Sequence, residues 1–261
     1  MTQVSYQVDQ SLLLELKKCT NTIHTSRTHF HNELSIGLIE QGCCQTTINQ
    51  KSFALNAGTL LIIPAKSTHR CQPQDVGNWK FRMLYVHHAW FSKFTFDQFR
   101  DGRIYSDLPS STFHEFIDEF KRLEQNFSHR KVETHALDDL VNMMDFQENN
   151  AASTHLTQSV PQDIQDMKHF IKKNCLKKLL LDELADHVGV DKYQLIRRFY
   201  RYMGLTPQKY LINLRINKAK KMLQNGLPIA DVAVTSGFYD QSHFSKYFKA
   251  YTGVTPMHYI Q

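Results

Sequence analysis

LIRRFYRYMGLTPQKY, at residues 195–210, returns in altered form as FSKYFKAYTGVTPMHY at residues 244–259. A bulky apolar residue, a phenylalanine, a glycine, a Thr-Pro pair and a tyrosine occupy equivalent positions in both stretches. Further upstream Gly189 corresponds to Gly237, although the offset between the copies is one residue shorter there. The pattern predicts a short helix, a turn with glycine and a second helix, twice over. Tandem helix-turn-helix units of this kind are typical of proteins that read DNA.

The first unit predicts a supporting helix followed by a reading helix. Residues 181–189 read as a short amphipathic helix that a glycine ends. Asp191 then has the capping position of the next helix, with Gln194 at capping-box spacing. Leu195 and Phe199 lie one helical turn apart and are expected to face the core. The other side of the helix offers side chains that can contact bases or phosphates: Lys192, Tyr193, Ile196 and Arg197.

The second unit has the same plan but different outward side chains. Asp240 is expected to cap its reading helix, and Phe244 and Phe248 are expected to face inward. Glutamine can pair with adenine, and serine and lysine can contact bases or phosphates. Because the outward residues differ between the units, we expect one chain to read two unlike half-sites. The candidates in the second unit are Gln241, Ser242, Ser245 and Lys246.

A long helix is predicted between the two units. Threonine caps helices and proline is favoured at the first helical position, so Thr206-Pro207 marks its start. Apolar residues keep a helical period up to Gly226, which gives roughly 18 residues or about 27 Å at ~1.5 Å per residue. Successive major grooves on one face of B-DNA lie ~34 Å apart. A rigid spacer of this order lets a single chain enter two successive grooves.

Charge divides the chain into two parts. Of its 31 Lys and Arg and 25 Asp and Glu, residues 163–261 hold 16 and 8, and residues 1–162 hold 15 and 17. The excess of positive charge in the part with the repeat suits contact with DNA phosphates. We find no apolar run of ~18 residues, no secretory leader and, with five cysteines, no disulfide framework. A cytoplasmic protein without membrane association is expected.

Residues 163–261 resemble the DNA-binding domain of the AraC/XylS family. The most specific pieces are Gly237-Phe238, Ser242-x-Phe244-x3-Phe248-Lys249 and Gly253-x-Thr255-Pro256-x2-Tyr259. The resemblance implies that the second helix of each unit enters a major groove, that RNA polymerase is a partner and that activation is the usual outcome. Asp191 stands where the family often has serine, and Arg198 where it usually has an apolar residue. The charge of Asp191 near phosphates predicts weaker DNA binding by the first unit.

Residues 24–90 predict a β-rich domain. LSIGLIEQG, CCQTTINQK, SFALNAG, TLLIIPAK and WKFRMLYV are short strand-like runs that Gly, Asn-Gln or Pro separate. His29-Phe30-His31 and Gly58-x5-Pro64-x4-His69 resemble motifs of the cupin double-stranded barrel, more closely the ligand-binding half of AraC-type regulators. In metal-binding cupins a glutamate follows the first motif after three or four residues. Ser35 and Ile36 stand at those positions here, so no metal is predicted.

A small-molecule pocket inside the barrel is the preferred interpretation. Side chains alternate along a strand, so Trp79, Phe81, Met83 and Tyr85 share one face, as do both histidines of the first motif, and as do His69 and Cys71. A His/Cys cluster would also suit zinc, which is the alternative. Pocket residues of a barrel also form its core, so both roles coexist. The predicted ligand-binding residues are His29, His31, His69, Cys71, Phe81 and Met83; no catalytic residue and no cofactor is predicted.

Two helices and a linker are predicted after the barrel. Apolar residues keep helical spacing at 113–127 and again at 132–144. The family resemblance implies that such helices pack on the barrel and often pair two subunits, so we expect a homodimer through residues 112–146, with packing inside one chain as the alternative. Residues 147–161 are polar and aperiodic. The predicted division is an effector-binding and dimerisation domain at 1–146, a linker at 147–162 and a DNA-binding domain at 163–261.

The predicted fold is α+β with two domains: a cupin-like double-stranded β-barrel with two helices, and an all-α domain with two helix-turn-helix units. The predicted function is a sequence-specific transcription regulator, an activator by family habit, that binds promoter DNA under the control of a small-molecule effector. One alternative is a metal-dependent cupin enzyme with a nucleic-acid module, which stoichiometric iron or manganese with turnover would favour. The other is a constitutive DNA-binding protein whose barrel only dimerises, which the absence of any small-molecule effect would favour.

Overall fold

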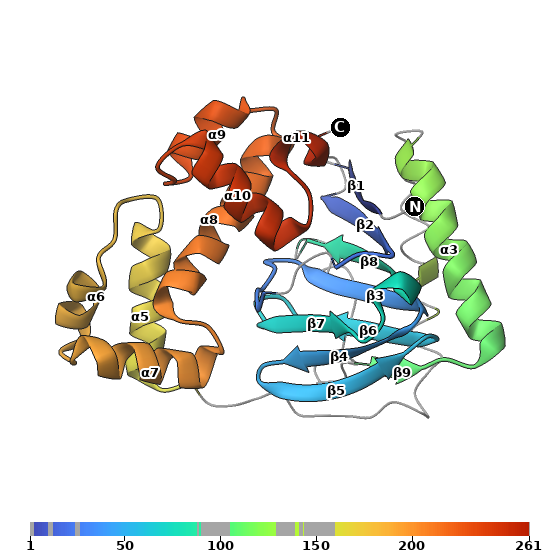
Figure 1. Ribbon diagram of the computed structural model, residues 1–261, viewed down its shortest axis with the longest axis horizontal. Coiled ribbons are helices and arrows are strands. Elements are labelled where there is room, and N and C mark those ends of the chain that lie inside the picture. Colours follow the sequence, from blue (N-terminus) through green and yellow to red (C-terminus); the bar gives the residue numbers. More distant parts are fainter. Residues whose placement is uncertain are drawn as a thin grey trace.

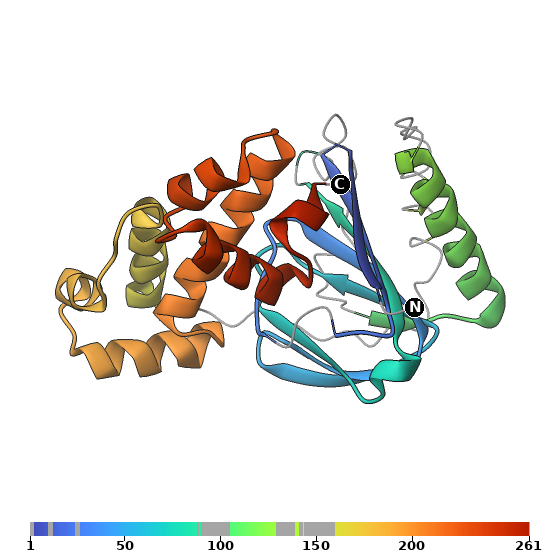
Figure 2. The same ribbon diagram turned by 45° about the horizontal axis from the view of Figure 1, so that its top comes forward.

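The computed structural model describes residues 3–9, 13–23, 27–87, 89, 105–128, 139–140, 143 and 160–260. A β-domain and a helical domain lie side by side (Figure 1). The helical domain covers one side of the β-domain, and α3 (Ser110–Ser128) lies on the opposite side in both views (Figures 1 and 2).

Antiparallel strands of the β-domain form a six-stranded sheet in the order β1-β2-β8-β3-β6-β9 and a three-stranded sheet in the order β5-β4-β7. The described part of the chain thus has the double-stranded, cupin-like plan that the sequence predicted, although no strand joins the two sheets into a closed barrel. The strands are β1 (Gln3–Asp9), β2 (Leu14–Thr20), β3 (Leu34–Gln41), β4 (Cys43–Ile48), β5 (Lys51–Asn56), β6 (Thr59–Ile63), β7 (His69–Pro73), β8 (Lys80–Val86) and β9 (Tyr105–Asp107).

Alternation along the strands sorts side chains between two apolar layers. On β8, Leu84 belongs to the outer layer, which α3 covers with Phe116 and Phe120. Phe81 and Met83 belong to the inner layer between the sheets. The apolar period of α3 is confirmed as a packing face for the sheet. The second predicted helix, at 132–144, lies mostly outside the described residues, as does 147–159 of the predicted linker.

The helical domain has the two predicted helix-turn-helix units. Gly189 adopts a left-handed conformation at φ 67° and ends the first supporting helix, and Asp191 accepts hydrogen bonds from the backbone N–H groups of Tyr193 and Gln194. Thr206 and Asp240 likewise cap the helices for which the sequence predicted them. The helices are α5 (Gln162–Asn174), α6 (Leu181–Val188), α7 (Lys192–Met203), α8 (Pro207–Gln224), α9 (Ile229–Thr235), α10 (Gln241–Thr252) and α11 (Pro256–Tyr259).

The 18-residue helix α8 connects the two units, as its pattern predicted (Figure 1). It is buried around much of its circumference, because it packs on both units and also on the β-domain. Asn213, Arg215, Asn217 and Lys220 are polar residues of α8 that become buried in these contacts. No described helix is long and apolar enough to cross a membrane.

Candidate DNA-binding surface and ligand pocket

The first reading helix, α7, presents two of its four predicted DNA contacts fully to solvent. Tyr193 is 73% exposed, and Arg197 is exposed as well. Ile196 is partly buried against the core of the domain, so only part of its side chain can reach a base. Lys192 forms an ion pair with Asp182 on α6, with 2.9 Å between Nζ and Oδ1. A phosphate contact by Lys192 therefore competes with this intramolecular pair.

The second reading helix, α10, presents Gln241, Ser242 and Lys246 to solvent, while Ser245 is partly buried. Phe244 and Phe248 are buried, as their spacing predicted. The outward surface therefore has the expected composition. Whether these residues bind DNA stays a prediction.

Sequence reasoning missed an aromatic residue next to α10. Tyr239, in the turn before the helix, is 90% exposed. An apolar ring of this size on the same edge as Gln241 gives the second unit a further candidate for a thymine methyl or a sugar. The signal available in the sequence was its position directly before the capping residue Asp240.

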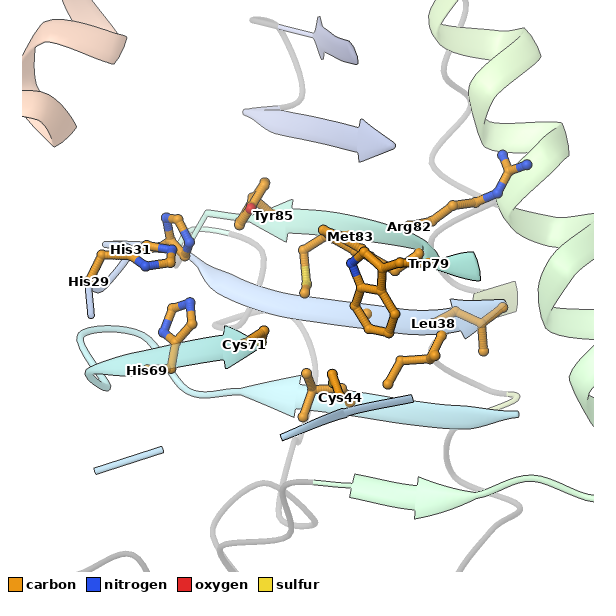
Figure 3. Close-up of a pocket in the computed structure, with 14 residues that line it drawn as sticks. His29, His31, Leu38, Cys44, His69, Cys71, Trp79, Arg82, Met83 and Tyr85 are labelled. Carbon is orange, nitrogen blue, oxygen red and sulfur yellow. The ribbon is translucent and has the colours of Figure 1, made fainter. Parts of the chain in front are cut away.

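The six predicted ligand-binding residues line one pocket between the two sheets. The pocket is narrow and mainly apolar, with a histidine cluster at one end and Trp79, Met83 and Cys44 toward the other (Figure 3). Arg82 points out of it toward α3, where Glu40 and Glu124 pair with its guanidinium (Figure 3). Gly37 forms the floor beneath Met83: a Cβ at this position would come within 2.7 Å of the methionine Cε. The free space in the pocket is only about 20 Å³, so a small apolar ligand fits only if flexible side chains such as Met83 move.

The histidine cluster joins His29, His31 and His69. His29 and His69 exchange backbone hydrogen bonds of 2.9 and 2.7 Å, which place their rings 4.3 Å apart. Burial is the main cause that lowers the pKa of all three imidazoles, for His69 to about 4. All three are therefore neutral at neutral pH.

Phe30, between the first two histidines, points the opposite way. It is 2% exposed and packs in the core of the first helix-turn-helix unit, with its ring 5.0 Å from that of Tyr210. Its backbone N–H donates to Asn213 Oδ1 at 2.8 Å, and its carbonyl accepts from the side-chain amides of Asn213 and Asn217. Alternation along one extended segment thus directs two histidines into the pocket and one phenylalanine into the helical domain.

A second contact between the domains centres on Glu15 of β2. Its carboxylate accepts from Lys220 Nζ at 2.7 Å, from the Tyr259 hydroxyl at 2.6 Å and from the Gln224 amide at 3.1 Å. Glu15 is 5% and Lys220 is 8% exposed, so this ion pair is buried. The ammonium of Lys220 also lies 5.1 Å from the ring centre of Tyr85, which lines the ligand pocket.

The β-domain also holds the C-terminal ends of both reading helices. The Tyr6 hydroxyl and Lys17 Nζ donate to the carbonyl of Thr252, the last residue of α10, at 2.7 and 3.2 Å. Gln50, in the turn between β4 and β5, donates to the carbonyl of Arg201 near the end of α7 at 2.7 Å. β1 lies beside the second unit in both views (Figures 1 and 2). The orientation of both reading helices is therefore tied to the β-domain.

Lys17 is the most deeply buried cation of these contacts, with 1% of its surface exposed. Burial lowers its pKa to about 7, and Lys220 adds to this effect. Its charge in turn lowers the pKa of His29, His31 and His69, so it acts on the same end of the pocket. Tyr6, Glu15 and Lys17 lie on β1 and β2, two strands that the sequence pattern did not predict.

Both domains match known families. A family model described as the AraC-like ligand binding domain matches residues 16–159, and one described as a helix-turn-helix domain matches residues 184–261.

Relatives and solved structures extend over most of the chain. The uncharacterized HTH-type transcriptional regulator YbfI of Bacillus subtilis is 27% identical over 91% of this chain and 88% of its own length. The melibiose operon regulatory protein of Escherichia coli is 24% identical over 89% and 82%. ToxT from Vibrio cholerae, solved with (E)-4-(8-methylnaphthalen-1-yl)but-3-enoic acid, is 12% identical with a TM-score of 0.56, over 100% of this chain and 98% of that one. The last similarity concerns the fold.

Proposed function

The chain belongs to the AraC family of transcription regulators, with an N-terminal ligand-binding domain and a C-terminal DNA-binding domain, and we propose that it activates promoters under the control of a small molecule that has an apolar body and one negatively charged group. The observation that carries the proposal is the set of contacts by which the ligand-binding domain holds the ends of both reading helices and the helix α8 between them. A ligand that shifts these contacts changes how the two helices are presented to DNA.

Each chain reads two successive major grooves in this proposal. Support comes from α8, whose 18 residues span about 27 Å and whose burial makes it a rigid spacer. The predicted base and phosphate contacts are Lys192, Tyr193, Ile196 and Arg197 on α7, and Gln241, Ser242, Ser245 and Lys246 on α10.

Arg197 and Gln241 provide the test of the DNA-reading surface. Replacing Arg197 by alanine should cost ~1–3 kcal/mol of binding free energy and relax specificity in one half-site only, because a bidentate base contact is worth that much. Gln241→Ala should do the same in the other half-site. Gel-shift titration against a library of half-site variants measures both effects. Lys51→Ala is the control, since Lys51 is an exposed cation of β5 outside both the reading helices and residues 112–146. Footprints unchanged in both reading-helix variants would refute the assignment.

The effector is an apolar molecule with a negatively charged group. The pocket lining is mainly apolar, and Lys17 and Lys220 lie near its histidine end with Glu15 as the carboxylate between the domains. ToxT was solved with a carboxylic acid on an aromatic frame, which has the same chemistry. The acid group would bind near the two lysines and its apolar part would replace the present packing around Met83. Effector binding would thereby alter the contacts of Lys17 with Thr252 and of Lys220 with Glu15.

Binding of such an acid should depend on pH with a definite sign. Lys17 carries its proton below its pKa of about 7 and loses it above, so the ammonium that attracts the anion disappears as the pH rises. We expect the Kd for (E)-4-(8-methylnaphthalen-1-yl)but-3-enoic acid to rise by up to about tenfold per pH unit above pH 7. Isothermal titration calorimetry of the full chain between pH 6 and 9 measures this. The Lys17→Met variant should bind weakly with no such slope, and a Kd for the unchanged chain that is constant over this range would contradict an anionic effector.

RNA polymerase and a second copy of the chain are the remaining proposed partners. The homodimer would form through residues 112–146, of which α3 has one face on the sheet and the other exposed.

Promoter footprinting with the full chain, with and without small carboxylic acids and sugars, tests the whole proposal. A footprint that changes with an acid supports it; one that changes only with a neutral sugar keeps the regulator and rejects the anion. A footprint that no small molecule changes favours a constitutive DNA-binding protein.

A further inference from the structure

Three imidazoles converge at the histidine end of the pocket, from two separate segments of the sequence. One nitrogen from each of His29, His31 and His69 lies within 4.8 Å of the others. Their ring centres are 4.3 to 5.1 Å apart, and Figure 3 shows the rings directed toward one another. Zinc binds imidazole nitrogen at ~2.0–2.1 Å, which places tetrahedral ligands about 3.3–3.4 Å apart, so these nitrogens must approach one another by up to about 1.5 Å through side-chain rotation.

The backbone fixes the tautomer of two of these histidines. Nδ1 of His29 lies 2.9 Å from the carbonyl of Arg27, and Nδ1 of His69 lies 3.0 Å from the carbonyl of Ser67. A carbonyl oxygen only accepts, so Nδ1 carries the proton in both rings and Nε2 carries the lone pair. A hydrogen bond from the second ring nitrogen to a backbone carbonyl is the arrangement that orients histidine ligands in metal sites.

We propose that His29, His31 and His69 bind one divalent transition-metal ion, of which Zn²⁺ suits three neutral imidazoles best. The proposal goes beyond the regulator function and does not depend on the identity of the effector. The sequence argued against a metal because Ser35 and Ile36 replace the cupin glutamate. The geometry removes that objection, since three histidines with a water or ligand oxygen in the fourth position form a complete zinc site.

The surroundings leave a place for that fourth ligand. The three histidines line the ligand pocket, and Tyr85 lies beside them with its ring centre 4.6 Å from that of His31. Glu15 offsets the charge of Lys220 nearby, whereas the charge of Lys17 opposes a cation at this end of the pocket. An acid group that enters the pocket could complete the coordination of the metal. Metal binding would then strengthen the binding of an anionic effector.

The metal site would also be connected to the DNA-binding domain. Phe30 lies between two of the proposed ligands, and its backbone N–H and carbonyl form hydrogen bonds with the side chains of Asn213 and Asn217 of α8. A metal that fixes His29 and His31 also fixes the backbone of Phe30. We therefore expect metal binding to stabilise the contact between the domains.

The experiment uses the full chain, freed of metal with a chelator and then dialysed against Zn²⁺ or Co²⁺. We expect one metal ion per chain by elemental analysis, and visible absorption bands of tetrahedral Co²⁺ that Zn²⁺ abolishes. His69→Gln and His31→Gln should each weaken binding by about 100-fold or more, because even outer-shell partners of a metal site are worth about 10- to 100-fold.

His114→Gln is the matched control, since His114 is exposed on α3, outside the cluster. It should leave stoichiometry and spectrum unchanged. His31 is only partly buried, so His31→Gln keeps the test valid if His69→Gln fails to fold. Absence of stoichiometric metal, or metal retained in both cluster variants, would overturn the proposal. Such a chain could still bind its promoter and respond to an acid, so failure of the metal site is distinguishable from failure of the regulator function.

Discussion

Replacing Glu15 by glutamine is expected to destabilise the contact between the domains by about 3–5 kcal/mol, because it leaves the buried Lys220 ammonium without its counter-charge. The Tyr259 and Gln224 side chains lose the charged acceptor as well. Urea unfolding of the full chain should show the second helix-turn-helix unit separating from the β-domain before the rest unfolds. The same variant should bind DNA with little dependence on effector, because α11 and α8 are no longer tied to β2.

Removing the charge of Lys220 tests whether the unpaired ammonium is what destabilises the Glu15→Gln variant. Glu15→Gln combined with Lys220→Met removes the unpaired charge and should recover most of the lost stability. Asp118→Asn is a matched control: Asp118 pairs with Lys121 on α3 where both are exposed, and such pairs contribute at most about 1 kcal/mol. If Glu15→Gln were no more harmful than Asp118→Asn, the buried pair would not be what joins the domains.

Replacing Phe30 by alanine has the second large expected effect. The ring is buried in the core of the first helix-turn-helix unit, so its removal should cost about 3–5 kcal/mol through lost burial and a cavity. We expect the Phe30→Ala variant to have a less stable helical domain and a weaker response of DNA binding to effector. Differential scanning calorimetry and gel-shift titration with and without the acid measure the two parts.

The Asn213→Ala variant distinguishes the contribution of the Phe30 ring from that of the hydrogen bonds to the Phe30 backbone. It leaves the Phe30 ring in place but removes the side chain that both accepts from the Phe30 N–H and donates to its carbonyl. We expect a smaller loss of stability, about 1–3 kcal/mol, with a similar loss of effector response. An effector response that survives in both variants would show that the pocket acts on DNA binding by another route, such as the Glu15 cluster.

The helical domain was largely predictable because its signals are local. Caps, glycine stops and the spacing of apolar residues act over a few residues, so Asp191, Gly189 and Thr206 marked helix ends correctly. The inner face of β8 was predictable for the same reason, since alternation is a property of one strand.

The strand β2 was missed because charged residues occupy positions that its fold buries, whereas β1 does show alternation, with Val4, Tyr6 and Val8 on one face. Glu15, Lys17 and Cys19 on β2 all face inward and are buried. Charged residues on an inward face contradict the usual pattern of a strand. Glu15 and Lys17 are stable there because groups of the other domain form hydrogen bonds with them: Lys220 and Tyr259 with Glu15, and the Thr252 carbonyl with Lys17.

The sequence by itself determined that this protein has two unlike helix-turn-helix units, a basic DNA-binding half and a β-rich half with a pocket, because repeats, caps and periodicity are written in neighbouring residues. Only the tertiary structure decided how the halves communicate. It placed three histidines from separate segments in one cluster, directed Phe30 between them into the other domain, and buried Glu15 against α8 and α11. The physical reason is that buried polar groups must find partners, and the partners of Glu15 and of the Phe30 backbone lie 183 to 244 residues away in the chain, where no local pattern can reveal them.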